Sequence, residues 1–176
     1  MKKQFSDILI YKRRKYFILD TMGDCLVHSD MRGMHAGPHQ NSFAKYKIIR
    51  RKLFLAEMTS RSLYRYDLPG AIVSSDGYYW DSEELDLKEE FTGVIRLARD
   101  IAEEQFAYVD DLSPLYYTTV LDISLVKGRV VDVKDLSLEV EQGRVKIKQR
   151  YAGGEELHVI VMEINRAFGV RVSEDS

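Results

Sequence analysis

Residues able to do chemistry gather in the stretch 20–43, which contains three of the four histidines. His35 and His39 are four residues apart, a spacing that puts two imidazoles on one face of a helix for a shared metal ion. Gly37 and Pro38 stand between them and disfavour that helix, so the pair would act from a loop. Further metal-ligand types lie nearby in the sequence: Asp24, His28 and Asp30. His35 and His39 are therefore weak candidates for a metal site, and an ordinary solvated loop is the alternative.

Other catalytic patterns are missing from the sequence. Cys25 is the single cysteine and has no histidine at a fixed spacing, so a small buried apolar side chain is its simpler role. Adjacent carboxylates on a strand point to opposite faces and could not serve one substrate together. Three such pairs occur: Glu83-Glu84, Glu89-Glu90 and Asp110-Asp111. No glycine-rich phosphate loop, nucleophile elbow or C-x-x-C motif occurs, so the sequence favours a protein that is not an enzyme and predicts no cofactor.

Aromatic side chains form the best candidate for a partner-binding surface. The chain has 11 tyrosines, and tyrosine is enriched at interfaces because it buries much area and keeps a polar end. The aromatic and irregular stretch 59–80 contains the predicted partner-binding residues: Tyr64, Tyr66, Tyr78, Tyr79 and Trp80. Core aromatics of a β-sheet are the alternative interpretation.

Basic residues also alternate with aromatic ones, as in proteins that bind single-stranded nucleic acid. The segments are 11–17, 45–47 and 61–66. The predicted hairpins place two adjacent basic pairs, Arg13-Arg14 and Arg50-Arg51, at turn tips, where basic residues also protect sheet edges. The predicted isoelectric point of about 6.1 argues against a nucleic-acid partner, which stays an alternative.

Regular secondary structure must position these residues, and its sequence pattern is clearest in the C-terminal half of the chain. Residues 121–133 and 136–148 each read as an apolar alternating run, a polar turn with Gly, and a second run. Gly128 and Gly143 occupy the same place in the two units, so we predict two successive β-hairpins. Apolar residues then recur at helical spacing, which predicts a helix over about 155–168 that ends at Gly169. A strand over 157–162 is the alternative, because residues 158–161 also favour β structure.

The rest of the chain continues the hairpin pattern. Further strands are predicted at 7–11, 15–19, 44–49, 53–58, 91–98, 106–109 and 116–126. The sequence therefore predicts one mainly β domain over residues 1–176. Its antiparallel hairpin core, 7–149, would form a meander that curls into a sandwich or partly open barrel, followed by the C-terminal helix.

Composition limits the location and the partners. One cysteine favours a reducing compartment, and the N-terminus shows no apolar signal segment or bilayer-spanning run, so we expect a cytoplasmic protein without a membrane partner. The net charge of −2 hides an asymmetry. Residues 1–67 contain 14 Lys and Arg against 6 Asp and Glu, whereas residues 68–176 contain 12 against 22. This asymmetry would give a dipolar surface only if the two halves do not interleave in space.

Several hairpin segments together resemble a family. They are 15–20 (KYFILD), 53–58 (LFLAEM), 91–97 (FTGVIRL) and 116–130, which ends in a K-G-R turn. Over residues 7–133 the chain resembles a group of small bacterial proteins in which an aromatic-x-Gly strand precedes a strand with such a turn. The resemblance implies a hairpin-rich β fold and adds no catalytic residue.

The leading functional hypothesis is a non-catalytic cytoplasmic module that binds another protein, in a regulatory or toxin-neutralising role. One alternative is a barrel that binds a small ligand or performs metal-assisted hydrolysis with the loop 20–43. The second alternative is single-stranded nucleic-acid binding by the basic hairpins. The sequence leaves the oligomeric state open.

Overall fold

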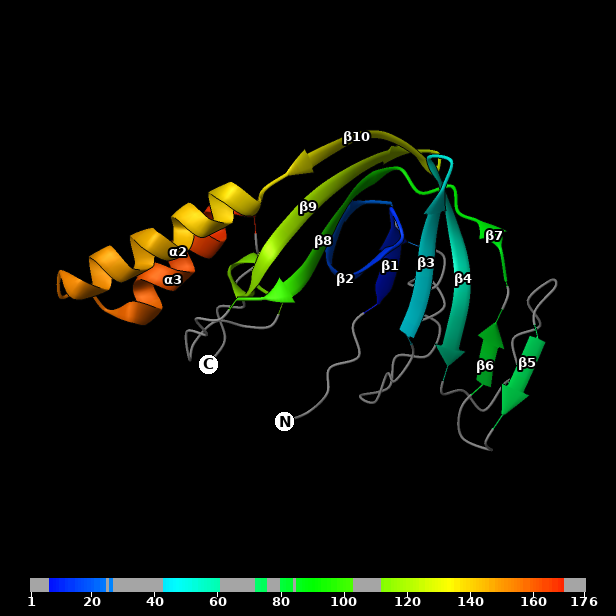
Figure 1. The fold of residues 1–176 in the computed structure, drawn as a ribbon, viewed down its shortest axis with the longest axis horizontal. Helices are drawn as coiled ribbons and strands as arrows, with labels where there is room; N and C mark the ends of the chain where they lie inside the picture. Colours follow the sequence, from blue (N-terminus) through cyan, green and yellow to red (C-terminus); the bar gives the residue numbers. More distant parts are fainter. Residues whose placement is uncertain are drawn as a thin grey trace.

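A strongly curved β-sheet with two helices at one end forms the molecule (Figure 1). The computed structural model describes residues 7–24, 26, 43–60, 72–75, 80–83, 85–102 and 112–169. The predicted fold class, mainly β with hairpins that curl into a sandwich or partly open barrel and a helix near the C-terminus, is confirmed.

Three tight hairpins supply most of the sheet, as their alternating patterns predicted. Strands β1 (Ile8–Tyr11) and β2 (Arg14–Gly23) pair antiparallel, as do β3 (Phe43–Ile49) and β4 (Lys52–Ser60). The third hairpin joins β9 (Tyr117–Val126) to β10 (Arg129–Asp135) through Gly128, whose φ of 71° fits the left-handed turn predicted there. The predicted strand at 106–109 lies outside the described residues.

The order of strands in space departs from their order in the chain at three places: between β8 and β2, between β1 and β3, and between β4 and β6. The sheet runs β10-β9-β8-β2-β1-β3-β4-β6-β5, with β7 paired to β4. The remaining strands are β5 (Ile72–Ser75), β6 (Trp80–Glu83), β7 (Leu87–Lys88) and β8 (Gly93–Ile101). The neighbours β1 and β3 are parallel, which a meander does not contain, and β8 inserts between β2 and β9. At one end, β10 returns to pair with β4 through Arg129 and Lys52, so the curved sheet closes on itself there.

The interior of this curved sheet is a dry aliphatic and aromatic core. Its fully buried side chains come from strands on both sides of the closure, including Leu9, Tyr46, Leu53, Ile95 and Ile123. Each of these residues belongs to the inward-facing set of an alternating strand, which is why period-2 patterning predicted the strands. Burial of this apolar surface is the main force that holds the hairpins together.

The predicted second hairpin at 136–148 is wrong, because residues Ser137–Ala152 form helix α2. Leu136, Val140, Gly143 and Ile147 are buried, and they recur at the spacing of a helix. Leu138 and Val145, which the alternating pattern would place beside them, are exposed in the helix by 64% and 46%. The same residues satisfy both periods, so the sequence pattern alone could not separate strand from helix.

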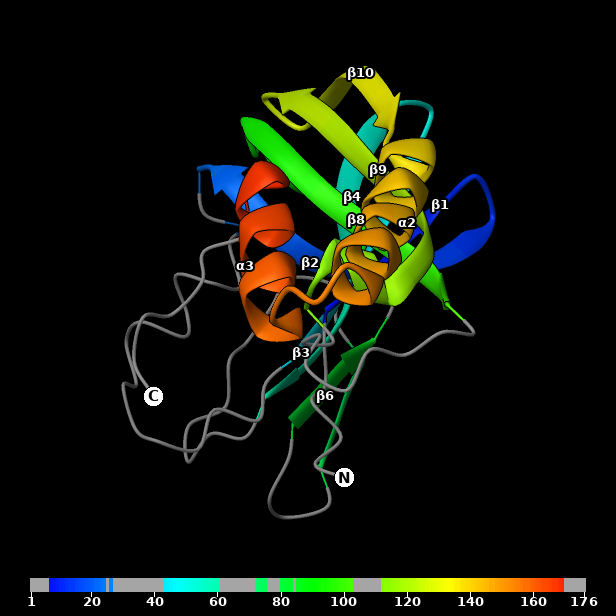
Figure 2. The same cartoon turned by 90° about the vertical axis from the view of Figure 1, so that its left-hand side faces the viewer.

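Gly143 therefore serves packing and not a turn. A Cβ atom at this position would lie 3.2 Å from Ile164 and 3.2 Å from Leu115, so glycine lets α2 approach its neighbours closely. The helix predicted at 155–168 is confirmed: residues Leu157–Ala167 form α3, which contains Ile164. The two helices lie side by side at the end of β9 and β10 (Figure 2).

A second core joins the helices to the sheet. It contains Leu115 of the short helix η1 (Pro114–Tyr116), Val120 of β9, and the inward faces of α2 and α3. Arg96 of β8 also reaches the helices: its guanidinium binds Asp122 at 2.8 Å through each of two nitrogens and donates to the Phe168 carbonyl at the end of α3. This bidentate bond with Asp122 raises the pKa of Arg96. None of the described helices is long and apolar enough to cross a bilayer.

Candidate functional site

Basic residues occupy the tips of all three tight hairpins. The β1–β2 tip is Lys12-Arg13, the β3–β4 tip is Arg50-Arg51, and the β9–β10 tip is Lys127-Gly128. Their φ angles lie between 47° and 71°, the left-handed values of type I′ turns. Such turns favour Asn and Gly, because other side chains are strained there. Lys and Arg at these positions therefore lower the stability of the fold while they place positive charge at the tips. Backbone strain of this kind is concentrated at functional sites.

Backbone hydrogen bonds bring two of the tips together. Leu53 N–H donates to the Gly128 carbonyl at 2.8 Å, and Val130 N–H donates to the Arg51 carbonyl at 2.9 Å. The Arg51 side chain then crosses to β10, where Nε and Nη2 donate to the Val130 carbonyl at 3.1 and 2.9 Å. The closure of the sheet thus brings Arg51 and Val130, which are 79 positions apart in the sequence, into contact.

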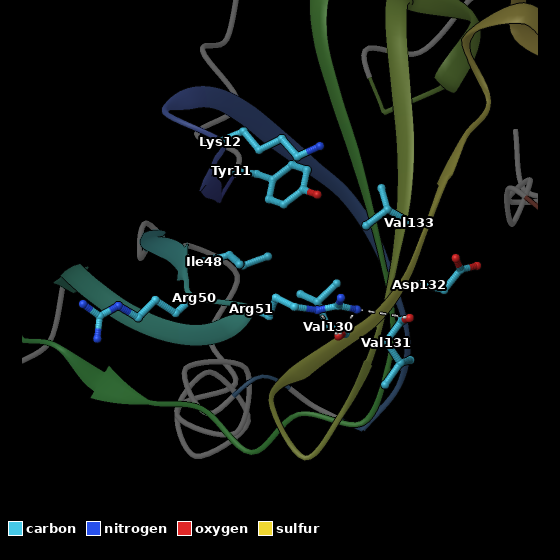
Figure 3. A pocket seen from close by; sticks show the side chains of 9 residues that line it. All are labelled: Tyr11, Lys12, Ile48, Arg50, Arg51, Val130, Val131, Asp132 and Val133. Carbon is cyan, nitrogen blue, oxygen red and sulfur yellow. Dashed lines mark hydrogen bonds between the residues drawn. The ribbon is translucent and has the colours of Figure 1, made fainter.

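The closure leaves an open groove beside it, which we call the basic groove. Its volume is about 510 Å³, and it is lined by Tyr11, Lys12, Ile48, Arg50, Arg51, Val130, Val131, Asp132 and Val133. Val133 faces Tyr11 and Ile48 across the groove, whereas the Asp132 carboxylate points away to the other side of β10 (Figure 3). The groove therefore combines an apolar interior with a cationic rim.

A group of exposed cations lies at this end of the molecule. We define the turn cations as the exposed residues Lys12, Arg13, Arg50, Arg51, Lys52, Lys127 and Arg129. Among the described residues none of them forms an ion pair with a carboxylate. Many cations elsewhere do pair with one: Lys45, Lys47, Lys88, Arg96, Arg99, Lys134 and Arg150. Five of the seven turn cations belong to residues 1–67, the basic part of the sequence.

The lining of the groove contains few side chains of the types that carry out covalent or acid–base catalysis. The only carboxylate in its lining is Asp132, and no histidine or cysteine joins it. Across the part of the chain that the structure describes, no three His, Cys, Asp or Glu side chains gather as a metal site requires. Lys12 lies with its Nζ 5.3 Å from the centre of the Tyr11 ring, so the aromatic face is already associated with a cation. The arrangement fits binding of an anionic and partly apolar group.

Most residues predicted for a site lie outside the described residues: His35, His39, Tyr64, Tyr66, Tyr78 and Tyr79. Trp80 begins β6, of which only the backbone is described. The proposed metal site and the aromatic partner surface therefore stay predictions. Nothing in the described groove depends on them.

In the segments where basic and aromatic residues alternate, the basic residues at the turn tips are exposed, whereas most of the described tyrosines are buried. Their predicted turn tips do carry exposed cations, but Tyr16 and Tyr46 are buried in the core with 5% and 0% exposure. Tyr117 is buried as well and packs edge-to-face on Tyr116, with ring centres 5.4 Å apart. A continuous stacking platform for bases is thus absent from the described residues, and Tyr11 is the aromatic side chain of these segments that lines the groove.

The wall contributed by β10 is the part of the site that sequence reasoning missed. Val130, Val131 and Val133 are ordinary strand residues in the sequence, and only the closure onto β4 gives them the hairpin tips as neighbours. A signal was present: three tight hairpins have Lys or Arg where type I′ turns favour Asn-Gly. No family model, curated protein or solved structure matches the chain.

Proposed function

We propose that this protein is a non-catalytic binding protein that recognises an acidic partner protein through the basic groove. The observation that supports this most strongly is the set of seven turn cations without a carboxylate partner among the described residues, three of which, Lys12, Arg50 and Arg51, line the groove. We expect its role to be regulatory or toxin-neutralising, in the cytoplasm.

The chemistry of the groove favours a protein over a small ligand. An interface needs an apolar centre with a polar rim, and here Tyr11, Ile48 and Val133 supply the centre while Lys12 and Arg50 belong to the rim. Exposed rim charges contribute mainly to the association rate and to the choice of partner. An acidic surface with protruding apolar side chains is the matching partner.

Nucleic acid is the second candidate, because the same turn cations would attract phosphates. Recognition of single strands also relies on several exposed aromatic rings on which bases stack. With Tyr16 and Tyr46 buried, the described part of the groove offers Tyr11 for that purpose. A protein partner accounts better for the apolar wall formed by β10.

The test is comparative capture of partners from a lysate of the source cells. Immobilised wild-type protein is compared with Lys12→Asn/Arg13→Gly and with a charge-matched control, Lys146→Gln/Lys148→Gln, on helix α2. We expect wild type and control to retain the same acidic protein, identified by mass spectrometry, and the groove variant to release it. Recovery should also fall as salt rises from low to physiological strength. The proposal is contradicted if the groove variant retains every protein that wild type retains.

A further inference from the structure

One of the two edges of β10 is paired with another strand only at its first residue, beside the basic groove. On one side, β10 pairs with β9 from Arg129 to Asp135, with a break in the register at Val131. On the other side it pairs with β4 through Arg129 and Lys52, because β4 begins there and the chain turns away through Arg50-Arg51. Beyond Val131, the described residues provide no backbone partner for this side of the strand.

The Arg51 side chain covers only the start of this edge. Its guanidinium donates to the Val130 carbonyl at 2.9 Å and to the Val131 carbonyl at 3.4 Å. An unpaired strand edge of this kind offers N–H and C=O groups to any extended chain that lies beside it. Many proteins capture peptides in this way, with main-chain bonds for affinity and side-chain pockets for selectivity.

Building on the proposed function, we propose that the acidic partner binds as an added β-strand along residues 131–134 of β10. The added strand would alternate apolar and acidic residues. Its apolar side chains would enter the groove over Ile48 and Val133, and its acidic side chains would meet Lys12, which lies over Tyr11 beside the groove (Figure 3). The groove volume of about 510 Å³ lies within the range of about 300–1,000 Å³ found for sites that bind small ligands, which is room for a few side chains.

A second copy of this chain is the competing occupant of this edge. Two β10 strands related by a two-fold axis would pair antiparallel. Strand β10 contains Arg129 and Lys134 against Asp132 and Asp135, so a second β10 has no net negative charge to offer the turn cations. An acidic segment is therefore the better match for this edge.

The test uses end-blocked peptides of eight residues with alternating Glu and Val, followed by fluorescence anisotropy at low salt. Alternate N–H groups of a strand point to opposite edges, so N-methylation of every Val blocks one edge and N-methylation of every Glu blocks the other. We expect one methylated peptide to bind like the unmodified peptide and the other to lose about tenfold or more in affinity, as removal of several hydrogen bonds predicts. A peptide of alternating Lys and Val serves as the charge control and should not bind.

The outcomes separate this inference from the proposed function. If both methylated peptides bind equally, or both fail equally, strand addition is overturned. If the unmodified peptide fails to bind while the lysate partner is still released by Lys12→Asn/Arg13→Gly, the groove binds an acidic protein in another way. If a homopyrimidine oligonucleotide binds more tightly than the peptide and that binding needs Lys12 and Arg13, both proposals fail in favour of nucleic acid.

Discussion

Replacing Lys12-Arg13 by Asn-Gly should stabilise the fold and weaken binding at the same time. Lys12 and Arg13 have φ angles of 48° and 64°, so they occupy the two left-handed positions of a type I′ turn. Asn-Gly is the pair that such turns prefer. The double variant Lys12→Asn/Arg13→Gly therefore keeps the backbone of the turn and removes both charges.

The stability gain follows from the strain in the turn. A left-handed conformation costs an ordinary L-residue about 1 kcal/mol or more, so relief at both positions is worth about 2 kcal/mol. Glycine lowers this gain by about 0.7 kcal/mol, because it gives the unfolded chain more conformational freedom. Loss of the exposed contact between Lys12 and the Tyr11 ring, 5.3 Å apart, removes about 0.5 kcal/mol more. The net gain is about 1 kcal/mol, or a rise in melting temperature of about 2–4 °C for a chain of this size.

Binding should move in the opposite direction. Two exposed charges at a rim contribute about 1 kcal/mol together, so the affinity for the alternating Glu and Val peptide should fall about fivefold at low salt. Thermal unfolding by circular dichroism and anisotropy titration measure the two effects on one sample. The control Lys146→Gln/Lys148→Gln has the same change in net charge and should bind the peptide as wild type does.

Two results would refute the reasoning. A melting temperature that falls would mean that the turn cations are not strained, and that weak binding reflects damage to the fold. A melting temperature that rises with unchanged binding would mean that the groove is not where the acidic peptide docks. Strain at a binding site and charge at that site are thus tested separately.

Three further predictions concern the framework of the site. Gly128→Ala should prevent folding or cost several kcal/mol in a denaturant titration, because its Cβ would lie 1.7 Å from a backbone oxygen. Arg96→Met should destabilise the protein by about 2–3 kcal/mol because the partly buried carboxylate of Asp122 loses its partner, and Arg96→Met/Asp122→Leu should recover part of that loss. Hydrogen bonds from Ser137 lower the pKa of Asp135, so its small stabilising effect is present above about pH 3.9 and is lost as the pH falls through the lowered value. Asp135→Ala should therefore flatten the acid limb of stability against pH, and an unchanged limb would contradict the assignment.

Sequence patterns predicted the hairpins because their information is local. An alternating run, a turn and a second run lie within about 15 residues, and a positive φ at Gly128 follows from the turn alone. The C-terminal helix was predictable for the same reason, because one apolar stripe recurs within its eleven residues, Leu157–Ala167. Helix α2 was not, since Leu136 and Val140 fit both a strand and a helix.

The candidate site was only half accessible to sequence reasoning. The basic tips at Arg13 and Arg50 could be located from turn positions, and their exposure follows from being tips. Their meeting with Val130 and Val133 could not, because it depends on the closure of β10 onto β4. Pairing between strands so distant in the chain is a property of the whole sheet and leaves no mark in a local window.

The sequence by itself thus determined the hairpin units, the charge at their tips and the final helix, because each depends on neighbours within one or two turns of chain. Only the tertiary structure decided that residues 137–152 are helical, since the choice rests on contacts of Gly143 with Ile164 and Leu115. The tertiary structure alone also brought the charged tips against an open strand edge. That juxtaposition arises because the curved sheet closes only at the first residues of β10 and β4, Arg129 and Lys52, and leaves the rest of that edge of β10 without a strand partner among the described residues.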